Sequence, residues 1–236
     1  MSRRLDVPPV RAVVVIGETL IDVVPASRGD DVDPGARELP GGSPANVAVT
    51  LGRLGRGPVL VTTLADDAHG AAARDWLEAA DVTVVAQPPA TGRTSTAAVR
   101  LAADGSATYD YDLSWDLASE TLTRAAVPGG IAVLHAGSIA TVLDPGAATV
   151  EAALREARGR ALVTFDPNAR PAITPDVAQV LPRVEPLVGL SDVVKVSDED
   201  LGWYHPGTDP MEVARAWGAD PPTPAEVDAV AQATTG

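Results

Sequence analysis

The sequence has no cysteine and few basic residues, and both shortages limit what the protein can be. Without cysteine there is no disulfide bond and no thiolate metal site. The 18 Lys and Arg residues are outnumbered by 32 Asp and Glu residues, which gives a net charge of −14. Because nucleic acids and anionic membranes are bound by clustered basic residues, we expect neither as a partner.

Several targeting and binding signals are missing as well. No apolar run approaches membrane-spanning length, and no apolar segment follows the two N-terminal arginines, so we expect a cytoplasmic protein. The three histidines, His69, His135 and His205, have no metal-ligand spacing. The sequence contains neither a Walker phosphate loop nor a Gly-x-Gly-x-x-Gly run after its first predicted strand, which argues against a dinucleotide-binding oxidoreductase. Any phosphate binding must use local groups, and Lys195, the only lysine, therefore stands out.

The chain does contain a regular alternation of two patterns. Short β-branched, apolar runs predict buried strands, and segments with apolar positions at helical spacing predict helices between them. This alternation indicates an α/β fold with helices packed on a mostly parallel sheet. The predicted strands are residues 12–16, 59–64, 82–85, 131–137, 161–165 and 192–196, and the predicted helices are 44–54, 68–80, 146–158, 175–187, one ending near 204, 209–217 and 225–231.

The segment from Gly41 to Gly55 combines a double-glycine turn with a short apolar helix. Two successive glycines permit positive φ and let another group approach bare backbone. Ser43 is predicted as the N-cap of the helix, and Gly55 lies where a C-terminal cap belongs. A capped helix after a loop explains Ser43 and Gly55 but leaves Gly41, Gly42 and Asn46 unexplained. A ligand site at the turn, with the Asn46 amide facing it, is the alternative.

Polar residues follow two of the predicted strands. Residues 20–24 continue the first strand after a break, which places Asp22 just past its carboxyl end, where open α/β sheets bind ligands. Asp22 is a candidate acceptor for a substrate hydroxyl, with an ordinary turn carboxylate as the alternative. Asp166, Asn168 and Arg170 lie together after another strand and would be costly to bury without partners, which also indicates a site.

Residues 94–113 depart from the α/β pattern. Two strand-like runs flank Asp104-Gly105, a dipeptide typical of tight hairpin turns. Alternation along the second run puts Tyr109 and Tyr111 on one face and the neighbouring carboxylates on the other. We expect a hairpin outside the main sheet that acts as a lid, with a decorative edge hairpin as the alternative.

Five segments, in order along the chain, resemble the PfkB family of carbohydrate kinases, which have the ribokinase-like fold. They are Gly17–Asp22, the run from Gly41 to Gly55, the Asp104-Gly105 hairpin, Phe165–Arg170 and Lys195–Asp200, within about residues 11–218. The resemblance implies a Rossmann-like, mostly parallel sheet with helices on both faces and a small β lid. The Asp-Pro-Asn-x-Arg form of the fourth segment is more similar to the fructokinase and ketodeoxygluconate kinase branch than to ribokinase.

The resemblance also implies site residues. The sugar would be bound by the glycine turn, by polar side chains around it and by the lid tyrosines: Asp22, Gly41, Gly42, Asn46, Tyr109, Tyr111 and Arg170. ATP and Mg²⁺ are the implied cofactors, with Lys195, Ser197 and Asp200 near the phosphates. The family usually has Asn-x-x-Glu where this chain has Ser197 and Asp200. The shorter Asp200 side chain would contact Mg²⁺ through water, more weakly than the usual Glu.

A second family signature, Asp-Thr-x-Gly-Ala-Gly-Asp, carries the catalytic base and forms the anion hole, and it does not occur in this sequence. No catalytic residue is therefore assigned. We expect a C-terminally incomplete kinase domain over residues 1–218, with the lid hairpin at about 93–113, and a divergent tail over 219–236.

The expected function is ATP-dependent phosphorylation of a hydroxyl of a small sugar, with fructose or a related keto sugar as the first candidate. The alternative is a truncated, catalytically impaired sugar-binding or interaction module. A homodimer formed through the lid is the expected assembly.

Overall fold

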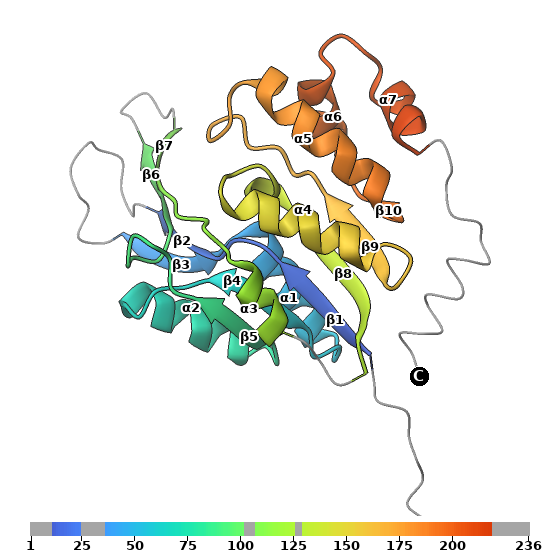
Figure 1. Cartoon of the computed structure of the whole chain (residues 1–236). Helices are drawn as coiled ribbons and strands as arrows, with labels where there is room; N and C mark the ends of the chain where they lie inside the picture. The colour runs from blue at the N-terminus through green and yellow to red at the C-terminus, as the bar shows by residue number, and fades with distance from the viewer. Residues whose placement is uncertain (1–10, 25–35, 102–106, 126–128, 219–236) are drawn as a thin grey trace, which may run out of the picture.

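The computed structural model describes residues 11–24, 36–101, 107–125 and 129–218 (Figure 1). Within these ranges six parallel strands form the main sheet, in the order β10-β9-β8-β1-β4-β5. The register pairs Val15 of β1 with Leu60 of β4 and with His135 of β8. The predicted parallel sheet is confirmed, with strand bounds β1 (Ala12–Ile16), β4 (Val59–Thr63), β5 (Thr83–Gln87), β8 (Ile131–Gly137), β9 (Leu162–Asp166) and β10 (Val193–Val194).

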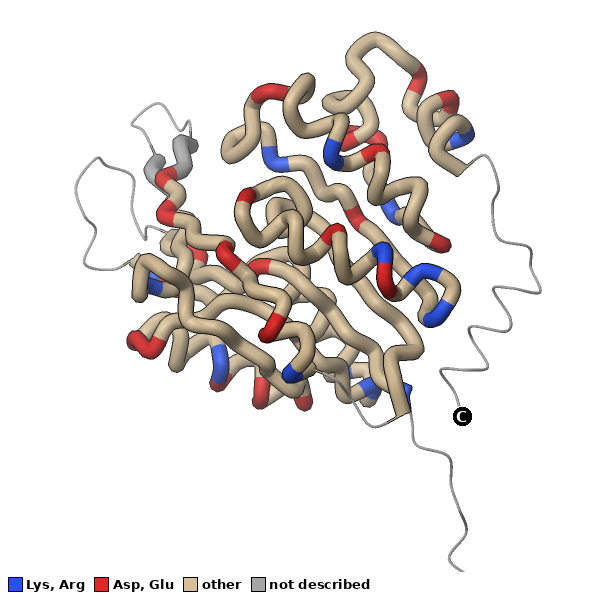
Figure 2. Tube along the Cα trace, in the orientation of Figure 1, with Lys and Arg blue, Asp and Glu red and all other residues tan. Residues whose placement is uncertain are grey.

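Helices cover both faces of the main sheet, as Figure 1 shows. One face carries α1 (Ser43–Arg53) and α2 (Ala68–Glu78), and the other carries α4 (Gly146–Ala157) and α5 (Val177–Leu190). The 3-10 turn η1 (Ser138–Thr141) follows β8, while α3 (Ser119–Arg124), α6 (Asp198–Tyr204) and α7 (Pro210–Trp217) complete the described helices. No helix in these ranges is long and apolar enough to cross a membrane. Acidic residues are spread over helices and strands in several parts of the structure, so the negative charge is dispersed (Figure 2).

Two apolar cores lie on the two faces of the sheet. Val14 and Ile16 of β1 belong to the core that also contains Leu154 of α4. Val15, between them, belongs to the core that contains Leu77 of α2. Successive side chains of a strand point to opposite faces, and here both faces are covered, which explains why the strand reads as a continuous apolar run.

A second sheet lies beside the main one, and we call it the lid sheet. Its order is β3-β2-β6-β7, formed by β2 (Leu20–Val24), β3 (Arg37–Gly41), β6 (Thr96–Leu101) and β7 (Ala107–Asp112). The predicted hairpin is confirmed, because β6 and β7 pair antiparallel outside the main sheet. The Asp104-Gly105 turn itself lies outside the described residues.

The prediction that residues 20–24 continue the first strand of the main sheet is wrong. The chain leaves that sheet after Ile16, and β2 pairs antiparallel with β3 and parallel with β6. Asp22 therefore lies in the middle of a lid strand, opposite Leu39, rather than past the end of β1. The pairing partners of β2 are thus β3, in the polar segment that ends at Gly41, and β6 of the hairpin.

Of the two caps predicted for α1, only the C-terminal one is found in the structure. At the C-terminus Gly55, with φ +73°, donates to the Gly52 carbonyl oxygen at 2.8 Å, and Arg56 donates to the Leu51 carbonyl oxygen at 3.0 Å. This is the glycine-ended Schellman arrangement, and the prediction for Gly55 is confirmed. Ser43 is not the N-cap, because the helix begins at Ser43 and Gly42, with φ 103°, occupies the cap position. The predicted helix at 225–231 lies outside the described residues.

Asp67 joins the base of the lid sheet to the main body. Its Oδ1 accepts hydrogen bonds from the Gly70 N–H and the Thr94 hydroxyl, both at 2.7 Å, and its Oδ2 accepts one from the Thr94 N–H at 2.9 Å. The first bond caps α2, and the other two hold the chain just before β6. Burial alone would raise the pKa of Asp67, but the bonds from Thr94 and Gly70 together hold that pKa below its usual value.

Asp67→Ala is expected to lower the free energy of unfolding by about 2–3 kcal/mol, because it removes a helix cap and two bonds to Thr94. Urea unfolding at neutral pH measures this loss. Asp66→Ala, at the exposed neighbouring position, should change the same free energy by less than about 0.5 kcal/mol. Equal losses in the two variants would contradict a role for these bonds.

Candidate functional site

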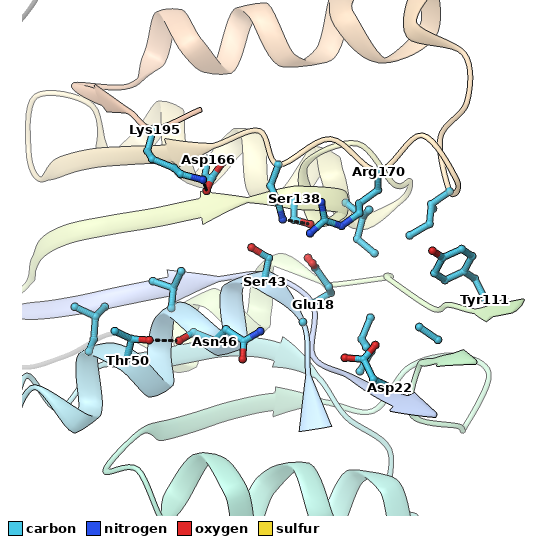
Figure 3. Close-up of a pocket in the computed structure, with 18 residues that line it drawn as sticks. Glu18, Asp22, Ser43, Asn46, Thr50, Tyr111, Ser138, Asp166, Arg170 and Lys195 are labelled. Atoms are coloured by element: carbon cyan, nitrogen blue, oxygen red, sulfur yellow. Dashed lines mark hydrogen bonds and ion pairs between the residues drawn. The ribbon is translucent and has the colours of Figure 1, made fainter. Parts of the chain in front are cut away.

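A pocket of about 610 Å³ lies between the lid sheet and the carboxyl ends of β1, β8 and β9 (Figure 3). Side chains from α1, from the lid sheet and from the segments that follow the three strands face into it. Its lining includes Glu18, Leu20, Asp22, Gly42, Ser43, Asn46, Val47, Thr50, Leu51, Ala97, Tyr111, Ser138, Ile139, Asp166, Asn168, Arg170, Ile173 and Lys195.

The double-glycine turn is in close contact with the connection between β1 and β2. A Cβ on Gly42 would lie 2.6 Å from the Glu18 carbonyl oxygen, and a Cβ on Gly41 would lie 2.4 Å from Asp22 Oδ2. Real side chains cannot approach this closely, so only glycine fits at either position without movement of its neighbours. The group that comes against the bare backbone is therefore part of the chain itself, and it includes the Asp22 carboxylate.

Asn46 lies in the first turn of α1 with its side chain directed toward the pocket (Figure 3). One turn later, Thr50 lines the same pocket and donates from its hydroxyl to the Asn46 carbonyl oxygen at 2.8 Å. The spacing of four residues puts both on one helix face. The primary amide of Asn46 can donate and accept hydrogen bonds, as recognition of a hydroxyl group requires.

Asp22 and Arg170 reach the pocket from opposite sides, one from β2 of the lid sheet and the other from the segment after β9 (Figure 3). Burial raises the pKa of Asp22, and the positive charge of Arg170 partly offsets this rise. The two predicted residues, 148 positions apart in the sequence, therefore share one electrostatic environment. Tyr111 also lines the pocket, whereas the side chain of Tyr109 lies outside the described part of the structure.

Glu18 is a pocket residue that none of the sequence patterns above indicated. It is 5% exposed, and its Oε2 accepts a hydrogen bond from the Ala140 N–H at 3.2 Å. Burial raises the pKa of Glu18 to about 7, although hydrogen bonds from Ser138 and Ala140 and the charge of Arg170 oppose the rise. One feature of the sequence does indicate its burial. Glu18 lies in a connection of only three residues between two apolar runs, so its side chain stays close to both of them.

The segments after β8 and β9 have unusual backbone conformations where they border the pocket. Ser138 has φ 57° and Asn168 has φ 40°, both in the left-handed region that side chains other than glycine seldom occupy. The two residues contact each other through a hydrogen bond from Asn168 Nδ2 to Ser138 Oγ at 3.3 Å. Strained backbone of this kind concentrates at functional sites, where the surrounding structure holds it in place.

Asp166 and Lys195 form an ion pair at the end of the pocket nearest β10. Lys195 Nζ donates to Asp166 Oδ2 at 3.0 Å, and the Lys195 side chain is 70% exposed. Asp166 Oδ1 is buried and has no hydrogen-bond partner among the described residues. Asp166 lines the pocket, and a buried carboxylate oxygen without a partner is suited to a cation or to a donor from a ligand.

The other two predicted phosphate-side residues, Ser197 and Asp200, lie outside the described lining of this pocket. Ser197 is the N-cap of α6 and accepts a hydrogen bond from the Asp200 N–H at 3.0 Å. Asp200 is buried, and both of its carboxylate oxygens accept hydrogen bonds from the protein. Their role toward ATP and Mg²⁺ stays a prediction.

Comparison with known proteins agrees with this architecture. A sequence profile described as pfkB family carbohydrate kinase matches residues 10–222. A fructokinase of Rhizobium leguminosarum bv. trifolii is 34% identical over 210 residues, which cover 87% of this chain and 63% of that protein. Fructokinase-1 of Oryza sativa subsp. japonica is 34% identical over 218 residues, which cover 87% and 66%. The chain thus spans less than two thirds of the length of these relatives.

Solved structures give the same result. A fructokinase from Xylella fastidiosa superimposes with a TM-score of 0.74 at 26% identity, covering 88% of this chain and 69% of that one. A sugar kinase from Pyrococcus horikoshii in complex with ATP superimposes with a TM-score of 0.70 at 25% identity, covering 81% and 65%. The ribokinase-like fold class predicted from the sequence is confirmed.

Glu18→Gln is expected to stabilise the protein at alkaline pH. The native pKa of Glu18, about 7, lies above the ordinary value of 4.5, so the stability associated with its protonated form is fully present below pH 4.5 and is lost as pH rises through 7. The neutral amide does not undergo this loss. Between pH 4.5 and pH 8 the free energy of unfolding of the variant should therefore rise relative to wild type by roughly 2–3 kcal/mol.

Urea unfolding over this pH range, with wild type and variant in parallel, measures the difference. Glu156→Gln, at an exposed position of α4, is the matched control for loss of one carboxylate. A difference between Glu18→Gln and wild type that stays constant with pH would contradict the expectation.

Proposed function

Because the chain belongs to the pfkB family of carbohydrate kinases, we propose that it binds a small neutral keto sugar and acts in transfer of the γ-phosphoryl group of ATP to a hydroxyl of that sugar. The observation that carries this proposal is the convergence of Asp22, Asn46 and Arg170 on one pocket between the two sheets. D-fructose is the first candidate, because the relatives named above are fructokinases. The activity remains a proposal for a chain that spans 63% of the first of these proteins.

The polar groups of the pocket suit a polyhydroxy ligand. The Asp22 carboxylate accepts hydrogen bonds, the Arg170 guanidinium donates them, and the Asn46 amide does both. A site built to hydrogen-bond hydroxyl groups rejects analogues without them, because its own polar groups would be left unpaired on binding. Substrate recognition by polar groups is thereby assigned to Asp22, Asn46 and Arg170. Gly41 and Gly42 are assigned to the same site through the close packing that they allow around Asp22 and Glu18.

The charges of the pocket favour a neutral sugar over a sugar acid. Arg170 acts electrostatically on both Asp22 and Glu18, and Lys195 is already paired with Asp166. The positive charges of both Arg170 and Lys195 are therefore offset by nearby carboxylates of the protein. A substrate carboxylate, such as that of 2-keto-3-deoxygluconate, would have to compete with these groups.

The lid sheet is proposed to close over the bound sugar. Tyr111 on β7 and Asp22 on β2 would then cover it from the lid side. Tyr109 remains a proposed sugar contact. Closure would exclude water from the transferred phosphoryl group.

Three further proposals concern the whole chain. We propose a single kinase domain over residues 1–218 with a tail over 219–236. We also propose a homodimer formed through the lid and a cytoplasmic location.

Lys195, Ser197 and Asp200 are the residues proposed to lie near ATP and its Mg²⁺. Magnesium in kinases is held by one or two carboxylates, with phosphate and water oxygens completing its shell. Asp166 fits this need, because its buried Oδ1 has no hydrogen-bond partner among the described residues and the residue lines the pocket. When bound, Mg²⁺ would neutralise charge on the transferred phosphoryl group.

A second candidate function is sugar binding without phosphoryl transfer. It is favoured by one observation on the sequence, which contains no Asp-Thr-x-Gly-Ala-Gly-Asp signature and hence no assigned catalytic base. A positioned base contributes about 10² to 10⁴ to a rate, so binding would persist where turnover does not.

Calorimetry with D-fructose, ribose and 2-keto-3-deoxygluconate, and ADP release in the presence of ATP and Mg²⁺, separate the two functions. Fructose binding with ADP release supports the kinase. Fructose binding without ADP release supports the binding module, and failure of every sugar to bind would contradict both.

Asn46→Ala is expected to weaken fructose binding by about tenfold or more, because it removes a donor and an acceptor from the pocket. Alanine is a good helix former, so α1 should persist. Arg53→Ala, at an exposed position of the same helix outside the pocket lining, should bind fructose as wild type does. Unchanged fructose affinity in Asn46→Ala would remove Asn46 from the site.

A further inference from the structure

Asp200 lies in the first turn of α6, and both of its carboxylate oxygens are bonded to the protein. Oδ1 accepts a hydrogen bond from the backbone N–H of Ala169 at 3.0 Å, and Oδ2 accepts one from the Ser197 hydroxyl at 2.7 Å. The residue is 9% exposed. Its contacts therefore point toward the segment after β9 rather than toward open solvent.

Ser197 and Asp200 orient each other. The Ser197 hydroxyl donates to Asp200 Oδ2 and, as the helix cap, accepts from the Asp200 N–H at 3.0 Å. Two bonds between the same two residues leave the carboxylate little rotational freedom. Oδ1 is thereby aimed at Ala169 before any ligand binds.

Ala169 is the link between Asp200 and the pocket. It follows Asn168, whose left-handed backbone turns the chain, and it is 8% exposed. Its N–H would be a buried donor without a partner if Asp200 were absent, which is an unfavourable state. Its carbonyl oxygen accepts a hydrogen bond from Arg170 Nη1 at 2.9 Å. Ala169 is thus held by Asp200 at its nitrogen and holds the Arg170 guanidinium at its oxygen.

We propose that Asp200 is a positioning residue that fixes the Asn168–Arg170 turn and so sets the direction in which Arg170 enters the sugar pocket. This inference rests on the proposed function, in which Arg170 contacts the sugar. Through this positioning role Asp200 affects sugar binding even when ATP and Mg²⁺ are absent. A residue that served only as a water-mediated magnesium contact would have no such effect.

The first test is calorimetry with D-fructose in the absence of ATP and Mg²⁺. Asp200→Ala is expected to raise the dissociation constant about tenfold, because the turn that carries Arg170 loses its anchor. Asp200→Asn should stay within about threefold of wild type, since its amide oxygen can still accept from the Ala169 N–H. Glu199→Ala, at the exposed neighbouring position, is the matched control and should bind as wild type does. Wild-type affinity in Asp200→Ala, or equal losses in the Ala and Asn variants, would overturn the inference.

The second test needs no sugar. Hydrogen–deuterium exchange of a peptide containing Ala169, in ligand-free protein, is expected to be at least about tenfold faster at that amide in Asp200→Ala than in wild type or Glu199→Ala. Unchanged exchange would overturn the inference by itself. Failure of wild-type protein to bind any sugar would instead contradict the proposed function.

If Asp200→Ala does not fold, Ser197→Ala replaces it in both measurements. That variant removes the donor that orients Asp200 Oδ2 but leaves the carboxylate in place. We expect about threefold weaker fructose binding and faster exchange at Ala169. Wild-type behaviour in both measurements would contradict the positioning role.

Discussion

The close contact between the double-glycine turn and the connection from β1 to β2 is the constraint on which the pocket depends. A Cβ on Gly17 would lie 2.1 Å from the Pro44 ring, and a Cβ on Gly42 would lie 2.6 Å from the Glu18 carbonyl oxygen. With no side chains at these positions, the connection passes directly over the start of α1. The contact sets the path of the chain from the end of β1 in the main sheet to β2 in the lid sheet, and with it the position of Asp22 in the pocket.

Energetically unfavourable features gather around this contact. They include the buried carboxyl group of Glu18, the left-handed backbone of Ser138 and Asn168, and Oδ1 of Asp166, for which the described residues provide no hydrogen-bond partner. The two apolar cores, which involve none of these residues, hold the segments that carry them. Such a division is typical of ligand sites, where polar groups are kept in place for a partner rather than for the stability of the fold.

The sequence predicts well those features that depend on nearby residues. The β-branched runs identify β1, β4, β8 and β9, and the glycine signal identifies the end of α1, because each depends on local periodicity or backbone freedom. The sheet to which β2 belongs was not predictable, since its partner β3 reads Arg-Glu-Leu-Pro-Gly and has no apolar alternation. Glu18 was missed because its hydrogen bond to Ala140 joins residues 122 positions apart. Site residues that belong to sequence motifs could therefore be predicted. Site residues that reach the pocket only through long-range packing could not.

The placement of Asp22 in the lid sheet has a consequence for the thermodynamics of binding. Asp22 and Tyr111 belong to one sheet, while Asn46 and Arg170 belong to segments built on the other. A ligand that contacts members of both groups acts as a noncovalent cross-link between two separately hydrogen-bonded sheets. Part of its intrinsic binding free energy is then used to hold the two sheets at one spacing, so the measured affinity reports the cost of that alignment as well as the strength of the contacts.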